Sequence, residues 1–250
     1  MTRLVAAVLL AWLLAACTAD AGQEARPTLR VLAAASLAEV VATLGERFEA
    51  DHPGLRIQYS FNGSAELVAG VRGGSPGDVL VTADASTMEG VVRAGASVTR
   101  PVVVARNRLA LAVPGGNPGG VRSLADLARD DLVVALCAPE VPCGSAAERL
   151  FAAVGVAPSV DTYESSVTGV LSKLMLGEVD AGLVYRTDLT VAGSAVTSVP
   201  LPPEASDVVN DYPAVVLRSA QNRRLAKDFL AYLQTPDARA ELRRAGFDLP

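Results

Sequence analysis

The chain has 250 residues, of which 50% are hydrophobic and 20% are charged, and its formal net charge at pH 7 is −5. This mildly negative balance supplies no basic surface for DNA or RNA, so nucleic acid is excluded as a partner. The length is sufficient for one large or two small domains.

The first residues are typical of an exported protein. A basic residue, Arg3, precedes an apolar run from Leu4 to Ala16, and Cys17 follows that run. The run has about 13 residues and is too short to span a bilayer, which needs about 20. This order indicates a signal peptide over residues 1–16 that ends in a lipobox. The alternative is an ordinary leader in which Cys17 has no role.

A lipobox makes Cys17 the first residue of the mature protein, with lipid chains that hold it to a membrane. Residues 17–27 are small and polar and are predicted to form the lipidated tether. We therefore expect an extracytoplasmic protein that is anchored to the cell membrane by an N-terminal lipid. The single tryptophan, Trp12, lies in the leader, so the mature protein would have none.

The chain has three cysteines, and lipidation of Cys17 leaves Cys137 and Cys143 as a pair six residues apart. In an exported protein this spacing indicates a small loop closed by a disulfide. Two buried free thiols are the alternative. A catalytic or metal-binding role is disfavoured, because no histidine stands near either cysteine.

Short apolar runs alternate with amphipathic stretches along the chain, which predicts an α/β fold with mainly parallel sheet covered by helices. In the first part of the chain, the predicted strands are 28–34, 55–61 and 78–82, and the predicted helices are 37–50 and 65–72. In the second part, the predicted strands are 109–113, 132–136, 159–163 and 181–185, with helices that start near Ser123, Ser145 and Val167.

A further strand is predicted over residues 212–217, followed by a helix over about 222–233. Thr235 and Pro236 then begin a last helix, and Gly246 ends it. Strands 109–113 and 212–217 are candidates for crossings between two lobes. Lobe I would comprise residues 28–108 and 212–250, and lobe II residues 109–211.

Four predicted strands end in a short turn that holds a serine or glycine and leads directly into a helix. These turns are Ala33–Leu37, Phe61–Ala65, Pro142–Ser145 and Ser165–Val167. Each presents unpaired backbone N–H groups and the positive end of a helix dipole, which together bind anions. The alternative is plain helix capping, because Ser36 with Glu39 and Ser145 with Glu148 have the spacing of capping boxes.

In open α/β sheets, ligands bind outside the carboxyl ends of strands, where such turns converge. No arginine or lysine occurs in the four turns. A site that offers only uncharged donors satisfies a fully ionised anion, whereas a protonated anion would place its own O–H against donors. The turns therefore favour molybdate, tungstate or sulfate over hydrogen phosphate.

Four segments, in this order, resemble the periplasmic molybdate-binding proteins of ABC transporters: Arg30–Leu37, Gly77–Asp84, Val179–Tyr185 and Phe229–Asp237. The resemblance covers nearly everything from about Thr28 to Phe247. It implies the two-lobed type II periplasmic-binding-protein fold, with mixed, mainly parallel sheets flanked by helices and two crossover strands.

The resemblance also implies how the oxyanion, molybdate or tungstate, is held. The expected donors to the oxyanion are the side-chain hydroxyls of Ser36, Ser64 and Tyr185 and the backbone N–H groups of Cys143 and Val167. Molybdenum enters only as molybdate through these residues, with no further cofactor. The implied partner is the membrane permease of an ABC importer, and we expect the protein to be a monomer.

Three alternatives stay open. The first is a binding protein for another solute, with sulfate as the serious competitor. The second is an enzyme on the same fold, but the single histidine, His52, lies in a turn that ends a helix, so Cys143 or Ser64 would lack a general base. The third is a structural surface lipoprotein with no ligand.

Overall fold

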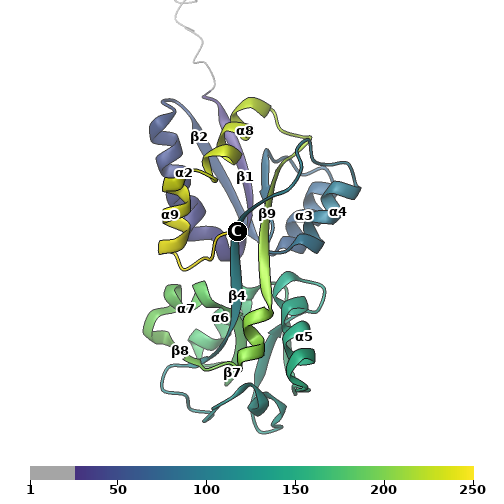
Figure 1. The fold of residues 1–250 in the computed structure, drawn as a ribbon, viewed down its shortest axis with the longest axis vertical. Helices are drawn as coiled ribbons and strands as arrows, with labels where there is room; N and C mark the ends of the chain where they lie inside the picture. The colour runs from purple at the N-terminus through teal and green to yellow at the C-terminus, as the bar shows by residue number, and fades with distance from the viewer. Residues whose placement is uncertain (1–25) are drawn as a thin grey trace, which may run out of the picture.

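The computed structural model describes residues 26–250, and the predicted leader, Cys17 and most of the predicted tether lie outside them. The described chain forms two lobes, one above the other in Figure 1, and strands β4 and β9 run from one lobe to the other. The predicted α/β fold with mixed sheets is confirmed.

Lobe I is built around a twisted sheet in the order β2, β1, β3, β9, β4. Strand β1 pairs in parallel with β2 and β3, and β9 is antiparallel to β3. Its elements are β1 (Thr28–Ala34), α2 (Ala38–Asp51), β2 (Arg56–Asn62), α3 (Ser64–Arg72), β3 (Val79–Val81), α4 (Ala85–Arg93), α8 (Arg223–Tyr232) and α9 (Pro236–Arg244). Strand β3 is apolar throughout because helices cover both of its faces.

Lobe II has a second mixed sheet, in which β5 pairs in parallel with β6 and β7. Its elements are β5 (Val134–Cys137), α5 (Pro142–Val154), β6 (Thr162–Glu164), α6 (Val167–Leu176), β7 (Ala181–Tyr185), α7 (Arg186–Ala192) and β8 (Val196–Val199). Each lobe has its own apolar core, so each can hold its half of a site rigidly.

The two crossing strands are longer than predicted. Strand β4 spans Val102–Pro114 and β9 spans Val209–Val216. The first half of β4 pairs with β9, and from Leu109 onward β4 pairs with β7. The polar residues around Asn107 interrupt the apolar pattern, although the backbone ladder continues through them. The expected start at Leu109 is therefore wrong by seven residues.

Other boundaries also differ from the prediction. The expected helix near Ser123 is a short 3-10 turn, Leu124–Ala128. Helix α5 begins at Pro142 and not at Ser145, because proline is suited to the first turn of a helix. The expected strand from Ser159 begins at Thr162. Helices α4 and α7 and strand β8 were not predicted.

The C-terminal helix agrees with its predicted signals. Helix α9 starts at Pro236, and the Thr235 hydroxyl accepts the N–H of Ala238. Gly246, just beyond the helix end, has a φ of 89°, a conformation that glycine adopts without strain. Within residues 26–250, no helix is both long and apolar enough to cross a bilayer.

Candidate functional site

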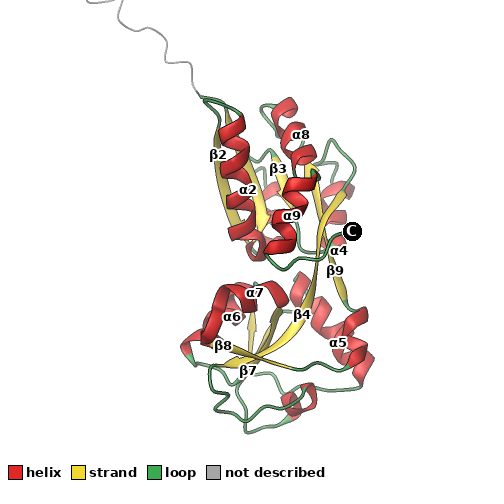
Figure 2. Cartoon of the chain, turned by 60° about the vertical axis from the view of Figure 1, so that its left-hand side comes forward, coloured by secondary structure: helices red, strands yellow, loops and turns green. Residues whose placement is uncertain are grey.

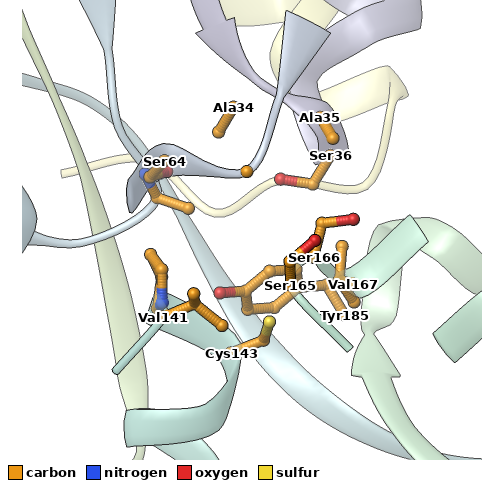
Figure 3. A pocket seen from close by; sticks show the side chains of 13 residues that line it. Ala34, Ala35, Ser36, Ser64, Val141, Cys143, Ser165, Ser166, Val167 and Tyr185 are labelled. Carbon is orange, nitrogen blue, oxygen red and sulfur yellow. The ribbon is translucent and has the colours of Figure 1, made fainter. Parts of the chain in front are cut away.

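A small cavity lies between the two lobes, where the four predicted turns meet (Figure 3). Ala34, Ala35, Ser36, Gly63, Ser64 and Ala83 line it from lobe I, and Val141, Pro142, Cys143, Ser165, Ser166, Val167 and Tyr185 line it from lobe II. Its volume is about 20 Å³, compared with about 10–15 Å³ for a cavity that holds one water. The space therefore suits one small ion and is too small for a bulky organic solute.

All five predicted binding residues line this cavity. Ser36 and Ser64 approach it from lobe I, opposite Cys143, Val167 and Tyr185 of lobe II (Figure 3). The sequence separations among them are large, so the fold alone brings them together.

Three helices begin at the cavity without a side-chain cap. They are α3 after Gly63, α5 after Val141 and α6 after Ser166. The first N–H groups of a helix have no partner within it, so these helices present free donors and a positive dipole end to the cavity. Helices α4, α8 and α9, whose N-caps do not line the cavity, are instead capped by Asp84, Asn222 and Thr235.

The Ser64 side chain is positioned as a donor. It is buried, and its Oγ accepts the backbone N–H of Ala83 at 3.0 Å. Because a protein donor already occupies the oxygen, the hydroxyl proton of Ser64 remains available for an acceptor in the cavity.

Tyr185 ends strand β7 and is fully buried at the lobe II side of the cavity. Its Oη accepts Nδ2 of Asn210 at 2.8 Å. Burial raises the pKa of Tyr185 well above its usual value, and the nearby Tyr212 adds to this effect. The hydroxyl therefore stays protonated at neutral pH and can donate its proton to an anion.

Ser36 lies in a 3-10 turn, Ala35–Leu37, between β1 and α2. Its Oγ is 3.0 Å from Oη of Tyr212, and the capping box expected with Glu39 is absent from this turn. Burial raises the pKa of Tyr212, so this tyrosine also keeps its proton. When Tyr212 donates to Ser36, the Ser36 hydroxyl is free to donate into the cavity.

The expected capping box of Ser145 and Glu148 is wrong. Ser145 lies within the first turn of α5, where its Oγ donates to the carbonyl of Pro142 at 3.3 Å. Proline at the first helical position moves the helix start three residues earlier than the serine indicated. Cys143 therefore belongs to the helix N-terminus, which is where its backbone N–H can meet an anion.

Cys137 and Cys143 form a disulfide in the structure, with their Cα atoms 5.7 Å apart. It joins the end of β5 to the first turn of α5, beside the cavity. Gly144 follows it, and a Cβ atom there would lie 1.9 Å from the carbonyl oxygen of Ala138. Glycine at this position thus allows the first turn of α5 to pack closely against the backbone of Ala138.

The electrostatics of the cavity rest on dipoles. Among its described lining residues, none has a charged side chain. An anion would be held by N–H and O–H groups among mostly buried residues, where such dipoles act more strongly than in bulk water.

The structure places His52 outside the cavity lining, at the end of α2. Its Nδ1 is 2.7 Å from the carbonyl of Phe48, and the two rings stack. Neither Cys143, which is in the disulfide, nor Ser64 has this histidine as a base. Within residues 26–250, no group of three or more histidine, cysteine, aspartate or glutamate side chains is placed to hold a metal ion.

Two functional residues were missed from the sequence, Asn210 and Tyr212. Both lie on β9 and reach the cavity through hydrogen bonds to Tyr185 and Ser36. The sequence carried only a weak signal for them. The predicted strand began at Tyr212 and so left Asn210 out, and a tyrosine in a strand is ordinarily part of a hydrophobic core. Asn210 is a polar residue that lies buried in a crossing strand, which the sequence pattern does not reveal.

Comparisons with known proteins agree with this geometry. The model of a family described as bacterial extracellular solute-binding protein matches residues 29–248. The molybdate-binding protein ModA of Mycobacterium tuberculosis (strain ATCC 25618 / H37Rv) is 39% identical over 255 residues, which cover 100% of this chain and 97% of that protein.

Two solved structures share the fold. The periplasmic molybdate-binding protein of Azotobacter vinelandii has a TM-score of 0.77 at 22% identity, and the match covers 89% of this chain and 99% of that one. The sulfate-binding protein SubI from Mycobacterium tuberculosis H37Rv has a TM-score of 0.76 at 19% identity, with coverages of 88% and 86%. At these identities the two likenesses establish the architecture and do not separate one oxyanion from another.

Proposed function

The chain belongs to the bacterial extracellular solute-binding proteins, and we propose that it captures molybdate between its lobes and delivers it to an ABC importer. The full-length relative that is 39% identical and named as a molybdate-binding protein carries this proposal. The small cavity lined by uncharged donors supports it independently. Within the family, the proposed role is binding and transport and not catalysis.

The proposed oxyanion site consists of the hydroxyls of Ser36, Ser64 and Tyr185 and the backbone N–H groups of Cys143 and Val167. Three observations support it: the residues line one cavity, the helices that begin there are uncapped, and the oxygens of Ser64 and Tyr185 already accept protein donors. Each of these groups then offers hydrogen to the anion.

This arrangement distinguishes anions by protonation. Hydrogen phosphate carries an O–H that needs an acceptor, and a site of donors leaves it unpaired at a cost of about 1–3 kcal/mol. Molybdate, tungstate and sulfate are acceptors only, so size decides among them. We propose tungstate as a second ligand because it has the same tetrahedral geometry and charge as molybdate.

A thermal-shift experiment tests the ligand. Micromolar molybdate or tungstate should raise the melting temperature, because a ligand at 100 times its Kd stabilises a protein by about 2.7 kcal/mol. Sulfate and phosphate at the same concentration should leave it unchanged. An equal shift with sulfate would defeat the assignment of molybdate as the ligand, and no shift with any oxyanion would support a structural lipoprotein.

The double variant Ser36→Ala with Ser64→Ala tests the site. Each hydroxyl bonded to a charged ligand contributes about 1.5–3 kcal/mol, so we expect molybdate affinity to fall by at least a hundredfold. Calorimetric titration measures it, with Ser172→Ala, an exposed serine on α6, as the matched control. Unchanged affinity in the double variant would remove both serines from the site.

We further propose that Cys17 carries the lipid that anchors the protein to the extracytoplasmic face of the membrane, where the monomer meets its permease. The basic residue, apolar run and Leu14–Cys17 segment support this. The wild-type protein should incorporate a labelled fatty acid, and Cys17→Ala should not. A wild-type protein that takes up no fatty-acid label would contradict lipidation.

A further inference from the structure

Asn210 is a buried amide that contacts both lobes next to the cavity. It lies near the start of β9, and its Nδ2 is 2.8 Å from Oη of Tyr185 and 3.2 Å from the carbonyl of Pro142, both in lobe II. The same Nδ2 is 3.0 Å from the carbonyl of Ala83 in lobe I. One side chain therefore joins the two walls of the cavity behind the proposed anion.

The chemistry of its neighbours fixes the orientation of this amide. Oδ1 of Asn210 accepts Nη2 of Arg149 at 2.9 Å. Arginine offers only donors and a backbone carbonyl only acceptors, so the amide oxygen must face Arg149 and the amide nitrogen must face Ala83. The nitrogen is then also the atom that faces Tyr185.

This orientation determines where the Tyr185 proton goes. An amide nitrogen can only donate, so the tyrosine oxygen accepts from Asn210, and its own hydrogen is directed to another acceptor. The phenol is buried and stays protonated. An oxygen of an anion in the cavity that Tyr185 lines can serve as this acceptor.

The same amide bonds to groups in both lobes. Ala83 follows β3 in lobe I, and it donates its N–H to Ser64 while its carbonyl accepts from Asn210. The two shorter bonds of Nδ2 are those to Tyr185 and Ala83, one in each lobe. A hydrogen-bonded path thus connects the donor hydroxyls of Ser64 and Tyr185 across the cleft.

We propose that Asn210 is a positioning residue for the oxyanion, which aims the Tyr185 hydroxyl proton into the cavity when the lobes are closed. Arg149 holds the amide in the required orientation, so a cation outside the cavity lining strengthens a binding site that has no charge of its own. This inference rests on the proposed function, because it requires a tetrahedral oxyanion in the cavity.

A double-mutant cycle tests the coupling between Asn210 and Tyr185. Asn210→Leu and Tyr185→Phe should each weaken molybdate binding by about tenfold to a hundredfold, as expected for one hydrogen bond to a charged group. The double variant should bind no more weakly than about the worse single variant, because both remove the same bond to the anion. Losses that multiply would overturn the proposal.

Tyrosine absorbance supplies a readout that a merely structural role would not change. The chain has five tyrosines, and its one tryptophan, Trp12, lies in the predicted leader, so tyrosine determines the difference spectrum of the mature protein. Saturating molybdate should produce a near-ultraviolet tyrosine difference signal that is lost in Tyr185→Phe and reduced in Asn210→Leu. A full signal in Asn210→Leu at saturation would show that the hydroxyl is aimed without the amide, and would refute the proposal.

A second variant, at exposed Arg149, keeps the proposal testable if Asn210→Leu does not fold. Arg149→Met removes the bond that orients the amide, and Arg129→Met removes a charge from lobe II that pairs with Asp131 and makes no contact with Asn210. We expect several-fold weaker binding and a reduced tyrosine signal for Arg149→Met and no change for Arg129→Met. Equal behaviour of the two variants would contradict the proposal that Arg149 orients Asn210 and thereby Tyr185.

The wild-type protein separates this proposal from the proposed function. If it binds sulfate and not molybdate, the choice of ligand fails, and the same cycle is run with sulfate. If the cycle shows independent losses with whichever oxyanion binds, the role of Asn210 fails while the binding function stands.

Discussion

Ser64 and Tyr185 face the cavity as donors because a protein N–H group occupies the oxygen of each hydroxyl. The partners are a backbone amide and a side-chain amide, and neither can accept a proton in return. The hydroxyls are therefore oriented as donors to the cavity before any anion binds. Such preorganisation reduces the cost of ordering groups on binding.

At this scale the sequence predicted the residues that contact the cavity but not those that orient them. Ser36 and Ser64 stand in turns with a recognisable strand-to-helix pattern, and Tyr185 ends an apolar strand. Asn210 has no local pattern, because its role comes from contacts with residues up to 127 positions away. Long-range hydrogen bonds of this kind follow only from the assembled fold.

Asp188 supports a prediction about pH. Its carboxylate accepts the backbone N–H of Tyr185, and burial raises its pKa from 3.8 to about 7. The unfolded chain loses this proton near pH 4 and the folded protein near pH 7, so the unfolded state binds fewer protons in between. The free energy of unfolding should therefore fall as pH rises from about 4 to 7 and then level off.

The variant Asp188→Asn should remove this slope, since an amide can still accept from Tyr185 without ionising. A pKa difference of about three units corresponds to about 4 kcal/mol at most. Chemical denaturation at pH 5 and pH 8 measures the free energy of unfolding. The stability of Asp188→Asn relative to wild type should be higher at pH 8 than at pH 5. Parallel profiles for the two proteins would show that Asp188 is not the group responsible.

Helices α3, α5 and α6 share an uncapped N-terminus at the cavity, while α4, α8 and α9 carry side-chain caps. A missing cap costs about 1 kcal/mol of helix stability. An anion at the shared end would supply the absent acceptor for all three helices. The pattern at the level of elements thus agrees with a ligand site and not with plain capping.

The sequence located these helix starts to within a few residues, and the largest error had a physical cause. For α5, the serine at position 145 suggested a cap, whereas Val141 is the N-cap and Pro142 begins the helix. Strong apolar periodicity placed β1 at the bounds that the structure shows, Thr28–Ala34. Elements with weak periodicity, such as β8 with its exposed centre, were missed.

The disulfide between Cys137 and Cys143 gives a prediction at the same scale. It joins two cysteines that are six residues apart, next to the N-terminus of α5. Closing a loop of this length stabilises the folded protein by about 2 kcal/mol, because it lowers the entropy of the unfolded chain. A reducing agent should lower the melting temperature and weaken molybdate binding, because the Cys143 N–H is less well fixed. The double variant Cys137→Ser with Cys143→Ser is the control and should not respond to the reductant; a wild-type protein that also fails to respond would contradict the prediction.

In the whole molecule, strands β4 and β9 connect the two lobes (Figure 2). Lobe I contributes Ser36 and Ser64, and lobe II contributes Tyr185 and two helix N-termini. Neither lobe alone surrounds the cavity. The binding energy of an anion can therefore favour the closed arrangement over an open one, as differential affinity for two states requires.

Gly63 marks a tight contact between the lobes and allows closure to be tested without altering a donor. A Cβ atom at Gly63 would lie 2.6 Å from the carbonyl oxygen of Ser165, a backbone atom of the other lobe that cannot rotate away. The φ of −54° and ψ of 137° at Gly63 are accessible to alanine, so each lobe should still fold. Gly63→Ala should thus obstruct closure and leave stability without ligand nearly unchanged.

We expect Gly63→Ala to weaken molybdate binding by at least tenfold, because full closure would require displacement of backbone at the cavity edge. Small-angle scattering should show that molybdate compacts the wild-type protein but not the variant. Gly70→Ala, in helix α3 of the same lobe, is the matched control, since its added Cβ would meet only the flexible side chain of Ser75 at 3.3 Å. If Gly63→Ala binds molybdate as tightly as this control, the contact between Gly63 and Ser165 is not part of the closed state that holds the anion.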